Sequence, residues 1–443
     1  MQTIADERKP WTHEFMTHTE ISEDCLYLNV WTGAKATGEK RPVYVYIYGG
    51  GNTEGSGAVP VYDGEGLAKQ GVIVVTVNYR LGVLGFFTHP GLTAESENHS
   101  SGNYALLDLI AALHWVHQNI AAFGGNPDRV TIGGQSAGAS NVHSLVASPL
   151  AKGLFHGAIA QSGSNVNTLS STTGRTLADQ EKTGVAFAEA KGAHSVADLR
   201  KLSWKELTAP VTGLTARFGP VVDGYVEPAP AGEIFAQHKQ NDVPTLTGCN
   251  LHDLGGASPR PATTADAFQK QAAQRYGENA ADFLKLYPAA NDEQAKTSQN
   301  DSAVDSMRAS MYLWAATRAK TAKTKSYTYF WDHTMPGPDA GQYGAFHTSE
   351  VPFVMNTLYM SDRPFTDADH KIASMMSAYW VNFIKTGDPN GKGLAHWAST
   401  ADQPGMTMEL GDKAAAIPVT GSKEKLSFFE GVLTRPRTTS ASR

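Results

Sequence analysis

Short apolar runs and amphipathic repeats alternate along the first third of the chain. Residues 43–48 and 72–77 consist mainly of Val, Ile and Tyr, which favour β-strands, and the second run presents apolar side chains to both faces. Residues 104–123 instead carry apolar side chains at spacings of three and four, which predicts an amphipathic helix. The following Gly124-Gly125-Asn126-Pro127 segment is expected to end that helix.

The same alternation continues towards the C-terminus. Further strands are predicted at residues 129–132, 156–160, 243–247 and 326–330, and further helices at about 137–147 and 371–385. Such an alternation predicts an α/β fold with a mostly parallel central sheet and helices on both of its faces.

The length of the chain fits one decorated domain. Residues 165–240 and 260–322 are more helical and more polar than the rest, so we expect them to be insertions that form a cap or a flanking lobe. We predict an N-terminal segment at residues 1–20, a single domain at residues 21–434 and a frayed polar tail at residues 435–443.

Charge and composition exclude several functional classes. The net charge of -6 over 443 residues is mild, and nucleic-acid binding needs clustered Lys and Arg, so no nucleic-acid partner is expected. No run reaches the roughly 18 apolar residues of a membrane span, and the polar residues 1–9 do not form a signal peptide. The chain is therefore predicted to be soluble, a monomer or weak homo-oligomer, and cytoplasmic, with a secreted or periplasmic location as the alternative.

The two cysteines, Cys25 and Cys249, are too few for a disulfide framework or a typical zinc site. One bridge between them is compatible with the count, but two unpaired buried thiols are expected. No metal site is predicted.

The candidate chemistry begins at Gly134-Gln135-Ser136-Ala137-Gly138, which matches the pattern G-x-S-x-G. The pattern alone is weak, but here it lies between a predicted strand and a predicted helix, which is the setting of a nucleophile elbow. Its two glycines leave room for a strained serine, and the N-terminus of the helix favours negative charge. Ser136 is therefore predicted to be a nucleophile, rather than an incidental serine in a tight turn.

A nucleophilic serine needs a general base and hydrogen-bond donors for the oxyanion. Gly49-Gly50-Gly51 follows a predicted strand and offers bare backbone N–H groups, and the N–H of Ala137 offers a further donor. A flexible turn or a phosphate-binding loop is the alternative for the three glycines, but no Gly-Lys-Ser/Thr follows them.

Among the 15 histidines, His347 is the candidate base, since it lies late in the chain in a loop after a predicted strand. The usual order in α/β-hydrolases is Ser, acid, His, which places the acid between Ser136 and His347. Asp253 and Asp223 both fit this interval. Asp253 follows a predicted strand, whereas Asp223 precedes a glycine and fits a turn.

Several further motifs make the chain resemble the type-B carboxylesterases, the group that includes the cholinesterases and the bacterial para-nitrobenzyl esterases. The resemblance extends over about residues 20–410, and the combination of motifs is highly specific. Besides the elbow, the matching segments are SEDCLYLNV at 22–30, YGGG at 48–51, VNYRLG at 77–82, GNY at 102–104, FGGNP at 123–127, QSGS at 161–164, GAFH at 344–347 and TGDPN at 386–390.

This resemblance implies a single α/β-hydrolase domain with a Ser-acid-His triad. In the family pattern the acid follows an Asn by three residues, which here selects Asp253 over Asp223. The resemblance also assigns the oxyanion hole to Gly50, Gly51 and Ala137.

The chain departs from the family pattern in three places. Gln135 replaces the Glu that family members usually carry beside the nucleophile, and Tyr48 stands where many members carry His. Members also have several dozen further residues before the segment at 22–30, which here leaves Cys25 without its usual disulfide partner. This difference suggests a truncated product or an unusually open site.

The predicted reaction is two-step acyl transfer on an uncharged, short-to-medium-chain carboxylic ester, the expected small-molecule partner. His347, oriented by Asp253, takes the proton of Ser136, and no metal or organic cofactor is required. Four residues are expected in the wall of an apolar pocket: Asn52, Phe218, Phe346 and Phe353. The alternatives are a non-catalytic adhesion or binding module, a long-chain lipase, and a truncated, weakly active esterase.

Overall fold

The computed structural model describes residues 9–18, 20–163, 175–214, 216–253 and 263–434 of the chain. The predicted tail at residues 435–443 lies outside the described residues, as do residues 1–8 of the predicted N-terminal segment. The same holds for residues 165–174 and 260–262, which begin the two predicted insertions.

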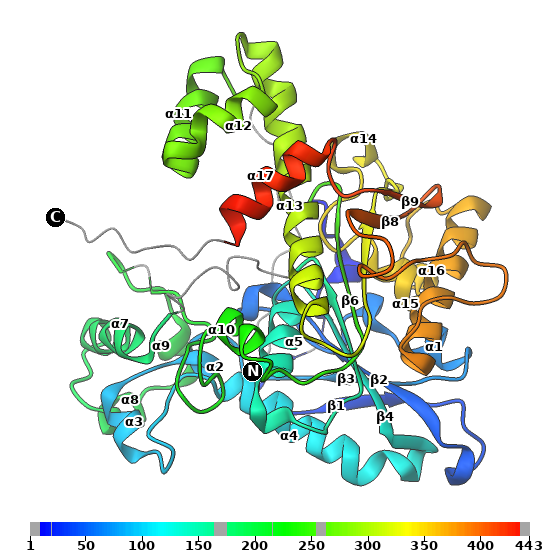
Figure 1. Cartoon of the computed structure of the whole chain (residues 1–443). Helices are drawn as coiled ribbons and strands as arrows, with labels where there is room; N and C mark the ends of the chain where they lie inside the picture. Colours follow the sequence, from blue (N-terminus) through cyan, green and yellow to red (C-terminus); the bar gives the residue numbers. More distant parts are fainter. Residues whose placement is uncertain (1–8, 19, 164–174, 215, 254–262, 435–443) are drawn as a thin grey trace.

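Within the described residues, a nine-stranded sheet forms the centre of the molecule, in the order β1-β3-β2-β4-β5-β6-β7-β8-β9 (Figure 1). From β3 to β8 along this order, adjacent strands are parallel to each other, while β1 pairs antiparallel with β3 and β9 pairs antiparallel with β8 at the two edges. The strands are β1 (Leu28–Trp31), β2 (Arg41–Ile47), β3 (Ile73–Val77), β4 (Gly125–Gln135), β5 (Gly157–Gln161), β6 (Thr245–Asn250), β7 (Ser326–Trp331), β8 (Met406–Leu410) and β9 (Ala414–Pro418). The predicted α/β fold with a mostly parallel sheet is therefore confirmed.

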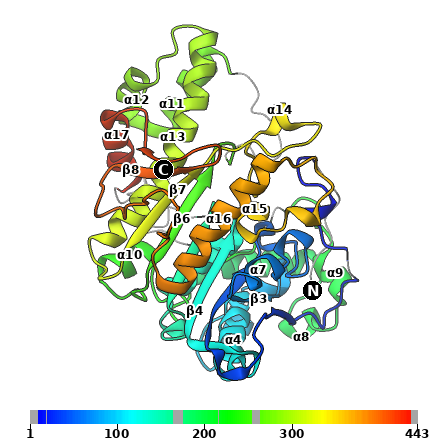
Figure 2. The same ribbon diagram turned by 90° about the vertical axis from the view of Figure 1, so that its right-hand side faces the viewer.

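Helices cover both faces of this sheet (Figures 1 and 2). Helices α4 (Tyr104–Asn119) and α5 (Ala137–Ala147) lie on one side, while α15 (Val351–Met355) and α16 (Asp367–Thr386) lie on the other. The other described α-helices are α1 (Glu65–Ala68), α2 (Gly82–Phe86), α3 (Pro90–Glu95), α7 (Leu177–Ala190), α8 (Val196–Leu199), α9 (Trp204–Thr208), α10 (Ala231–Ala236), α11 (Ala265–Tyr276), α12 (Ala280–Leu286), α13 (Asp292–Ala319), α14 (Ala340–Tyr343) and α17 (Lys423–Leu433).

The two predicted insertions contain separate groups of helices. Helices α7 to α10 follow β5, and α7 to α9 lie near α2 and α3, whereas α11 and α12 project away from the sheet at the top of Figure 1. Helix α13 begins beside that projecting pair and then packs against β6 and β7. The first group of helices borders the site described below.

Burial explains why the central strands appear in the sequence as continuous apolar runs. Tyr44 and Val45 of β2, and Ile73 and Val74 of β3, are each at most 1% exposed, as expected of strands covered on both faces. Gly124, after α4 and the short turn η5 (Ile120–Phe123), has φ 83° and ends the helical segment where the sequence predicted.

Two further expectations concern membranes and disulfides. In the described ranges, no helix combines the length and the apolar character needed to cross a membrane. Cys25 and Cys249, which both lie in these ranges, are buried and are not joined by a disulfide.

Candidate active site

Ser136 lies between the end of β4 and the start of α5. Its backbone has φ 58° and ψ −124°, a conformation that costs a non-glycine residue about 1–3 kcal/mol. Two backbone hydrogen bonds hold the turn. Ser136 N–H donates to the carbonyl of Gln161 at 2.8 Å, and Ser140 N–H donates to the carbonyl of Ser136 at 3.1 Å. The strand-turn-helix geometry of a nucleophile elbow is therefore present at the predicted serine.

Close backbone approaches require glycine on both sides of this turn. A Cβ atom at Gly138 would lie 2.0 Å from the carbonyl oxygen of Ile47, so α5 can pack on the end of β2 only without a side chain there. A Cβ atom at Gly49 would lie 2.6 Å from the carbonyl oxygen of Gln135. The glycine loop after β2 and the elbow are therefore in direct backbone contact.

His347 and Asp253 form a hydrogen-bonded pair, with 2.7 Å between His347 Nδ1 and Asp253 Oδ1. The Asp253 side chain is 2% exposed, and its other oxygen accepts a hydrogen bond from the N–H of Asn250 at 2.8 Å. Burial lowers the pKa of His347, but the hydrogen bond and the charge of Asp253, with a smaller contribution from Glu350, outweigh burial and raise that pKa. The carboxylate thus orients the imidazole and stabilises its protonated form.

The segments that carry the acid and the base are also joined through their backbones. His252 pairs with Phe346 in a parallel β-bridge, and His252 N–H donates to the carbonyl of Ala345 at 3.1 Å. The side-chain amide of Asn250 donates to the carbonyl of Phe346 at 2.8 Å. The positions of Asp253 and His347 relative to each other are therefore fixed on both sides.

Gln135, immediately before Ser136, contacts the same imidazole. Its side-chain nitrogen lies 3.2 Å from His347 Nε2 and 3.4 Å from His347 Nδ1. The two distances are nearly equal, so the amide nitrogen lies over the ring rather than in line with the lone pair of Nε2. Because a carboxylate only accepts hydrogen bonds, Asp253 holds the ring proton on Nδ1. The ring therefore has the tautomer that a general base needs, with its lone pair at Nε2.

The predicted oxyanion donors lie at the N-termini of two helical segments. Ala137 is the first residue of α5, while Gly50 and Gly51 begin the short turn η3 (Gly50–Asn52). The N–H groups at such positions have no acceptor within their own helix. The positive φ angles of Gly50 (71°) and Gly51 (62°) are ones that glycine adopts without strain. Backbone donors are thus available beside Ser136.

A buried network holds the glycine loop in place. Tyr79 Oη donates to the carbonyl of Tyr48 at 2.7 Å and lies 3.2 Å from the carbonyl oxygen of Gly49. The rings of Tyr79 and Tyr48 are stacked, with centroids 4.6 Å apart. On the other side, Asn141 of α5 donates to Asn52 Oδ1 at 2.9 Å. The loop is therefore attached both to the segment after β3 and to the elbow helix.

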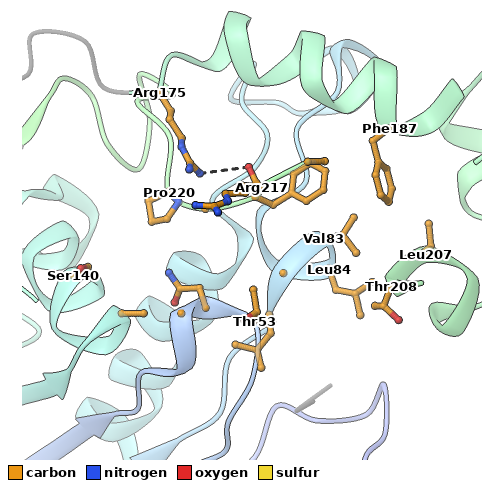
Figure 3. A pocket seen from close by; sticks show the side chains of 18 of the residues that line it. Thr53, Val83, Leu84, Ser140, Arg175, Phe187, Leu207, Thr208, Arg217 and Pro220 are labelled. Atoms are coloured by element: carbon orange, nitrogen blue, oxygen red, sulfur yellow. Dashed lines mark hydrogen bonds between the residues drawn. The ribbon is translucent and has the colours of Figure 1, made fainter. Parts of the chain in front are cut away.

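The reaction centre borders two cavities. One, of about 440 Å³, is lined by Ser136, His347, Gly50 and Gly51. The other, of about 1190 Å³, is lined by Gly51 and Ala137 at one side and extends towards α7 and α9 (Figure 3). Because Gly51 lines both cavities, the glycine loop forms the border between them.

Comparison with known proteins identifies the family. The model of the carboxylesterase family matches residues 3–429 of the chain. The chain belongs to the carboxylesterase family.

Three relatives illustrate the similarity. The fumonisin B1 esterase of Sphingopyxis macrogoltabida is 35% identical over 403 residues, which cover 85% of this chain and 71% of the relative. The cocaine esterase of Oryctolagus cuniculus is 35% identical over 403 residues, covering 85% of this chain and 73% of the relative. A medium-chain fatty acyl-CoA hydrolase precursor of Anas platyrhynchos is 33% identical over 426 residues, covering 89% of this chain and 74% of the relative. This carboxylesterase is therefore a carboxylic ester hydrolase, as the resemblance to the type-B group implied.

Two of the four residues expected in the pocket wall line one of the two cavities of this carboxylesterase. Asn52 and Phe218 line the larger cavity. Phe346 and Phe353 line neither cavity. They are 1% and 0% exposed, and Phe353 packs against Trp331, so both belong to the core behind His347. The expectation for these two residues is corrected, because an apolar residue near a catalytic motif fits a core position as well as a pocket wall.

The segment at residues 9–18 contributes to the site, which the sequence did not indicate. Trp11 Nε1 donates to the carbonyl of His347 at 3.0 Å. Trp11, Phe15 and Met16 line the smaller cavity together with Ser136. The N-terminal segment of the carboxylesterase therefore forms part of the wall beside Ser136. Its aromatic residues follow no periodic pattern that could have revealed this.

Asp223, the alternative acid, has a local role in a turn. Its oxygens accept hydrogen bonds from Ser100 Oγ at 2.7 Å and from the N–H groups of Tyr225 and Glu227 at 3.0 and 2.9 Å. These contacts are typical of an Asp that stabilises a turn. The carboxylate that contacts His347 is Asp253.

Glu350 is a second buried carboxyl group close to the Asp253–His347 pair. It is 0% exposed and accepts hydrogen bonds from Gln161 Nε2 at 3.0 Å and from Asn250 Nδ2 at 2.6 Å. Burial, with the nearby charge of Asp253, raises the pKa of Glu350 to about 7. Within the described ranges of the carboxylesterase, no group of three or more His, Cys, Asp or Glu side chains could hold a metal ion.

Proposed function

We propose that this carboxylesterase hydrolyses short-to-medium-chain carboxylic esters through an acyl-enzyme intermediate on Ser136. The observation that carries the proposal is that Ser136 and His347 line one cavity, with Asp253 hydrogen-bonded to Nδ1 of the imidazole. A nucleophile, a base and an orienting carboxylate in this arrangement are what acyl transfer requires.

The reaction proceeds in two steps. His347 Nε2 takes the hydroxyl proton as Ser136 Oγ attacks the ester carbonyl, and the N–H groups of Gly50, Gly51 and Ala137 donate to the resulting oxyanion. His347 then gives its proton to the departing alcohol. In the second step a water molecule attacks the acyl-enzyme with His347 again as the base, which releases the carboxylic acid.

The size and lining of the smaller cavity support a substrate with a short or medium-length chain. Trp11, Phe15 and Val59 are among the residues that line its 440 Å³. The larger cavity leaves room for the other part of the ester. The name of the relative from Anas platyrhynchos, a medium-chain hydrolase, agrees with chains of this length.

The test is hydrolysis of p-nitrophenyl acetate, butyrate, octanoate and palmitate by the wild-type protein and by Ser136→Ala. The wild type should turn over the shorter esters faster than palmitate, and Ser136→Ala should lose at least about 10⁴-fold in kcat. Circular dichroism shows whether both proteins are folded. Equal rates in both folded proteins would overturn the proposal, and no turnover by the folded wild type would favour a non-catalytic binding module.

A further inference from the structure

The larger cavity has an apolar wall and a basic rim. It is lined by Gly51 and Ala137 beside Ser136 and by Arg175 and Arg217 elsewhere in its wall (Figure 3). Its lining also includes four large apolar side chains: Leu84, Phe187, Leu207 and Phe218. A substrate chain that occupies this cavity would therefore contact apolar surface and come within reach of the two arginines.

The two arginines lie together without an acidic partner. Arg175 Nη1 donates to the carbonyl of Arg217 at 3.4 Å, and Figure 3 shows both side chains beside Pro220. Among the described residues, neither guanidinium forms an ion pair with a carboxylate. The adjoining residues 164–174 and Thr215 include no Asp or Glu in the sequence. Two neighbouring positive charges repel each other, so a bound anion would relieve this repulsion as well as pair with them.

The remaining titratable groups in the cavity wall do not neutralise this charge. Burial raises the pKa of Glu227 to about 7, although Ser144 Oγ donates a hydrogen bond to it. Burial, with the nearby Arg318, lowers the pKa of His143 to about 3, so this imidazole is neutral. The cavity therefore has a net positive charge in a chain whose net charge is -6.

We infer that the larger cavity receives a part of the substrate that is apolar along its length and ends in a carboxylate. The carboxylesterase should then favour esters that carry such a carboxylate over neutral esters of the same shape. This inference rests on the proposed function and names the substrate class of the same site. It differs from the uncharged ester expected from the sequence, because no pattern in the chain placed Arg175 and Arg217 at this cavity.

The test compares matched pairs of esters on both sides of the ester bond. On the acyl side, mono-p-nitrophenyl suberate is compared with p-nitrophenyl 8-methylnonanoate, in which an isopropyl group replaces the carboxylate. On the alcohol side, the butyrate ester of 6-hydroxyhexanoic acid is compared with 6-methylheptyl butyrate. The measured quantity is the ratio of kcat/KM for the anionic ester to kcat/KM for the neutral one.

In at least one pair, the double variant Arg175→Gln/Arg217→Gln should lower this ratio by about fivefold or more, the size expected of two partly exposed ion pairs. The variant Arg275→Gln removes an exposed arginine of α11 instead and should leave the ratio unchanged. Added NaCl should lower the ratio in the wild type but not in the double variant.

An unchanged ratio in both pairs, with the neutral esters still hydrolysed, would overturn the inference and leave the proposed function intact. Absence of hydrolysis of the neutral esters by the folded wild type would instead count against the proposed function itself.

Discussion

Replacing Gln135 by Glu should move the pH dependence of the reaction towards higher pH. Gln135 is 2% exposed, and its side-chain nitrogen lies 3.2 Å from His347 Nε2. A carboxylate in the same place would stabilise the imidazolium and so raise the pKa of His347 further. His347 must be neutral to accept the proton of Ser136. The acid limb of the pH profile of kcat/KM should therefore shift to higher pH as that pKa rises.

The structure sets the size of this effect. At 3.2 Å and an effective dielectric constant of about 20, the attraction between a carboxylate and the imidazolium is about 5 kcal/mol. Burying the new carboxylate, close to Asp253 and Glu350, offsets much of this gain and leaves a net effect of about 1–3 kcal/mol. At 1.36 kcal/mol per pH unit, the acid limb should rise by about 1–2 pH units.

The assay is the kcat/KM of p-nitrophenyl butyrate between pH 5 and 9. On the acid limb, Gln135→Glu should be about 10–100-fold slower than the wild type, and the two should converge at high pH. The variant Gln135→Met removes the amide without adding charge, so the acid limb of its pH profile should move much less than that of Gln135→Glu. A limb that stays in place or moves to lower pH in Gln135→Glu would refute the reasoning.

Three further variants test other parts of the site. Asp253→Asn should reduce kcat by about 10³–10⁴-fold, because an amide that donates to Nδ1 leaves the proton of His347 on Nε2; steady-state kinetics at pH 8 measures this loss. Tyr79→Phe removes the O–H that donates to the loop before Gly50, and urea unfolding should show a loss of about 1–3 kcal/mol. The pKa of Glu227 rises from 4.5 to about 7 on folding, so its contribution to stability falls as the pH rises through this range. Between pH 5 and 8, the unfolding free energy of the wild type should therefore fall by about 2–3 kcal/mol more than that of Glu227→Gln.

Local patterns were sufficient for the centre of the fold and for the strand-turn-helix segment at Ser136. The strand at residues 43–48 was predictable because it is a run of Val, Ile and Tyr buried on both faces. The helix at residues 104–123 was predictable because the spacing of its apolar residues identifies one buried face. Ser136 was predictable because the elbow needs glycines at fixed positions in a strand-turn-helix segment. The edge strands β1 and β9 were not predicted, since their side chains are at most partly buried or, in β9, largely exposed. Strand β8, next to β9, was not predicted either, since it mixes buried and partly buried positions.

Contacts between distant segments could not be predicted from local patterns. Nothing near Trp11 indicates that its indole donates to the carbonyl of His347, which lies 336 positions later in the chain. The choice of Asp253 over Asp223 came from the resemblance to a family, because both residues lie in loops after apolar segments. Phe353 was assigned to the pocket, although its side chain is buried against Trp331. In each case the deciding information is a tertiary contact.

The most direct test of the account is covalent labelling of the nucleophile. Diethyl p-nitrophenyl phosphate should react with the active protein, release one equivalent of p-nitrophenol, and leave a diethylphosphoryl group on Ser136. Tandem mass spectrometry of the tryptic peptide at residues 130–152 distinguishes this serine from the other serines in that peptide. Ser136 should be modified stoichiometrically, in parallel with the loss of esterase activity. Inactivation with the label on another residue, or full activity after Ser136 is labelled, would contradict it.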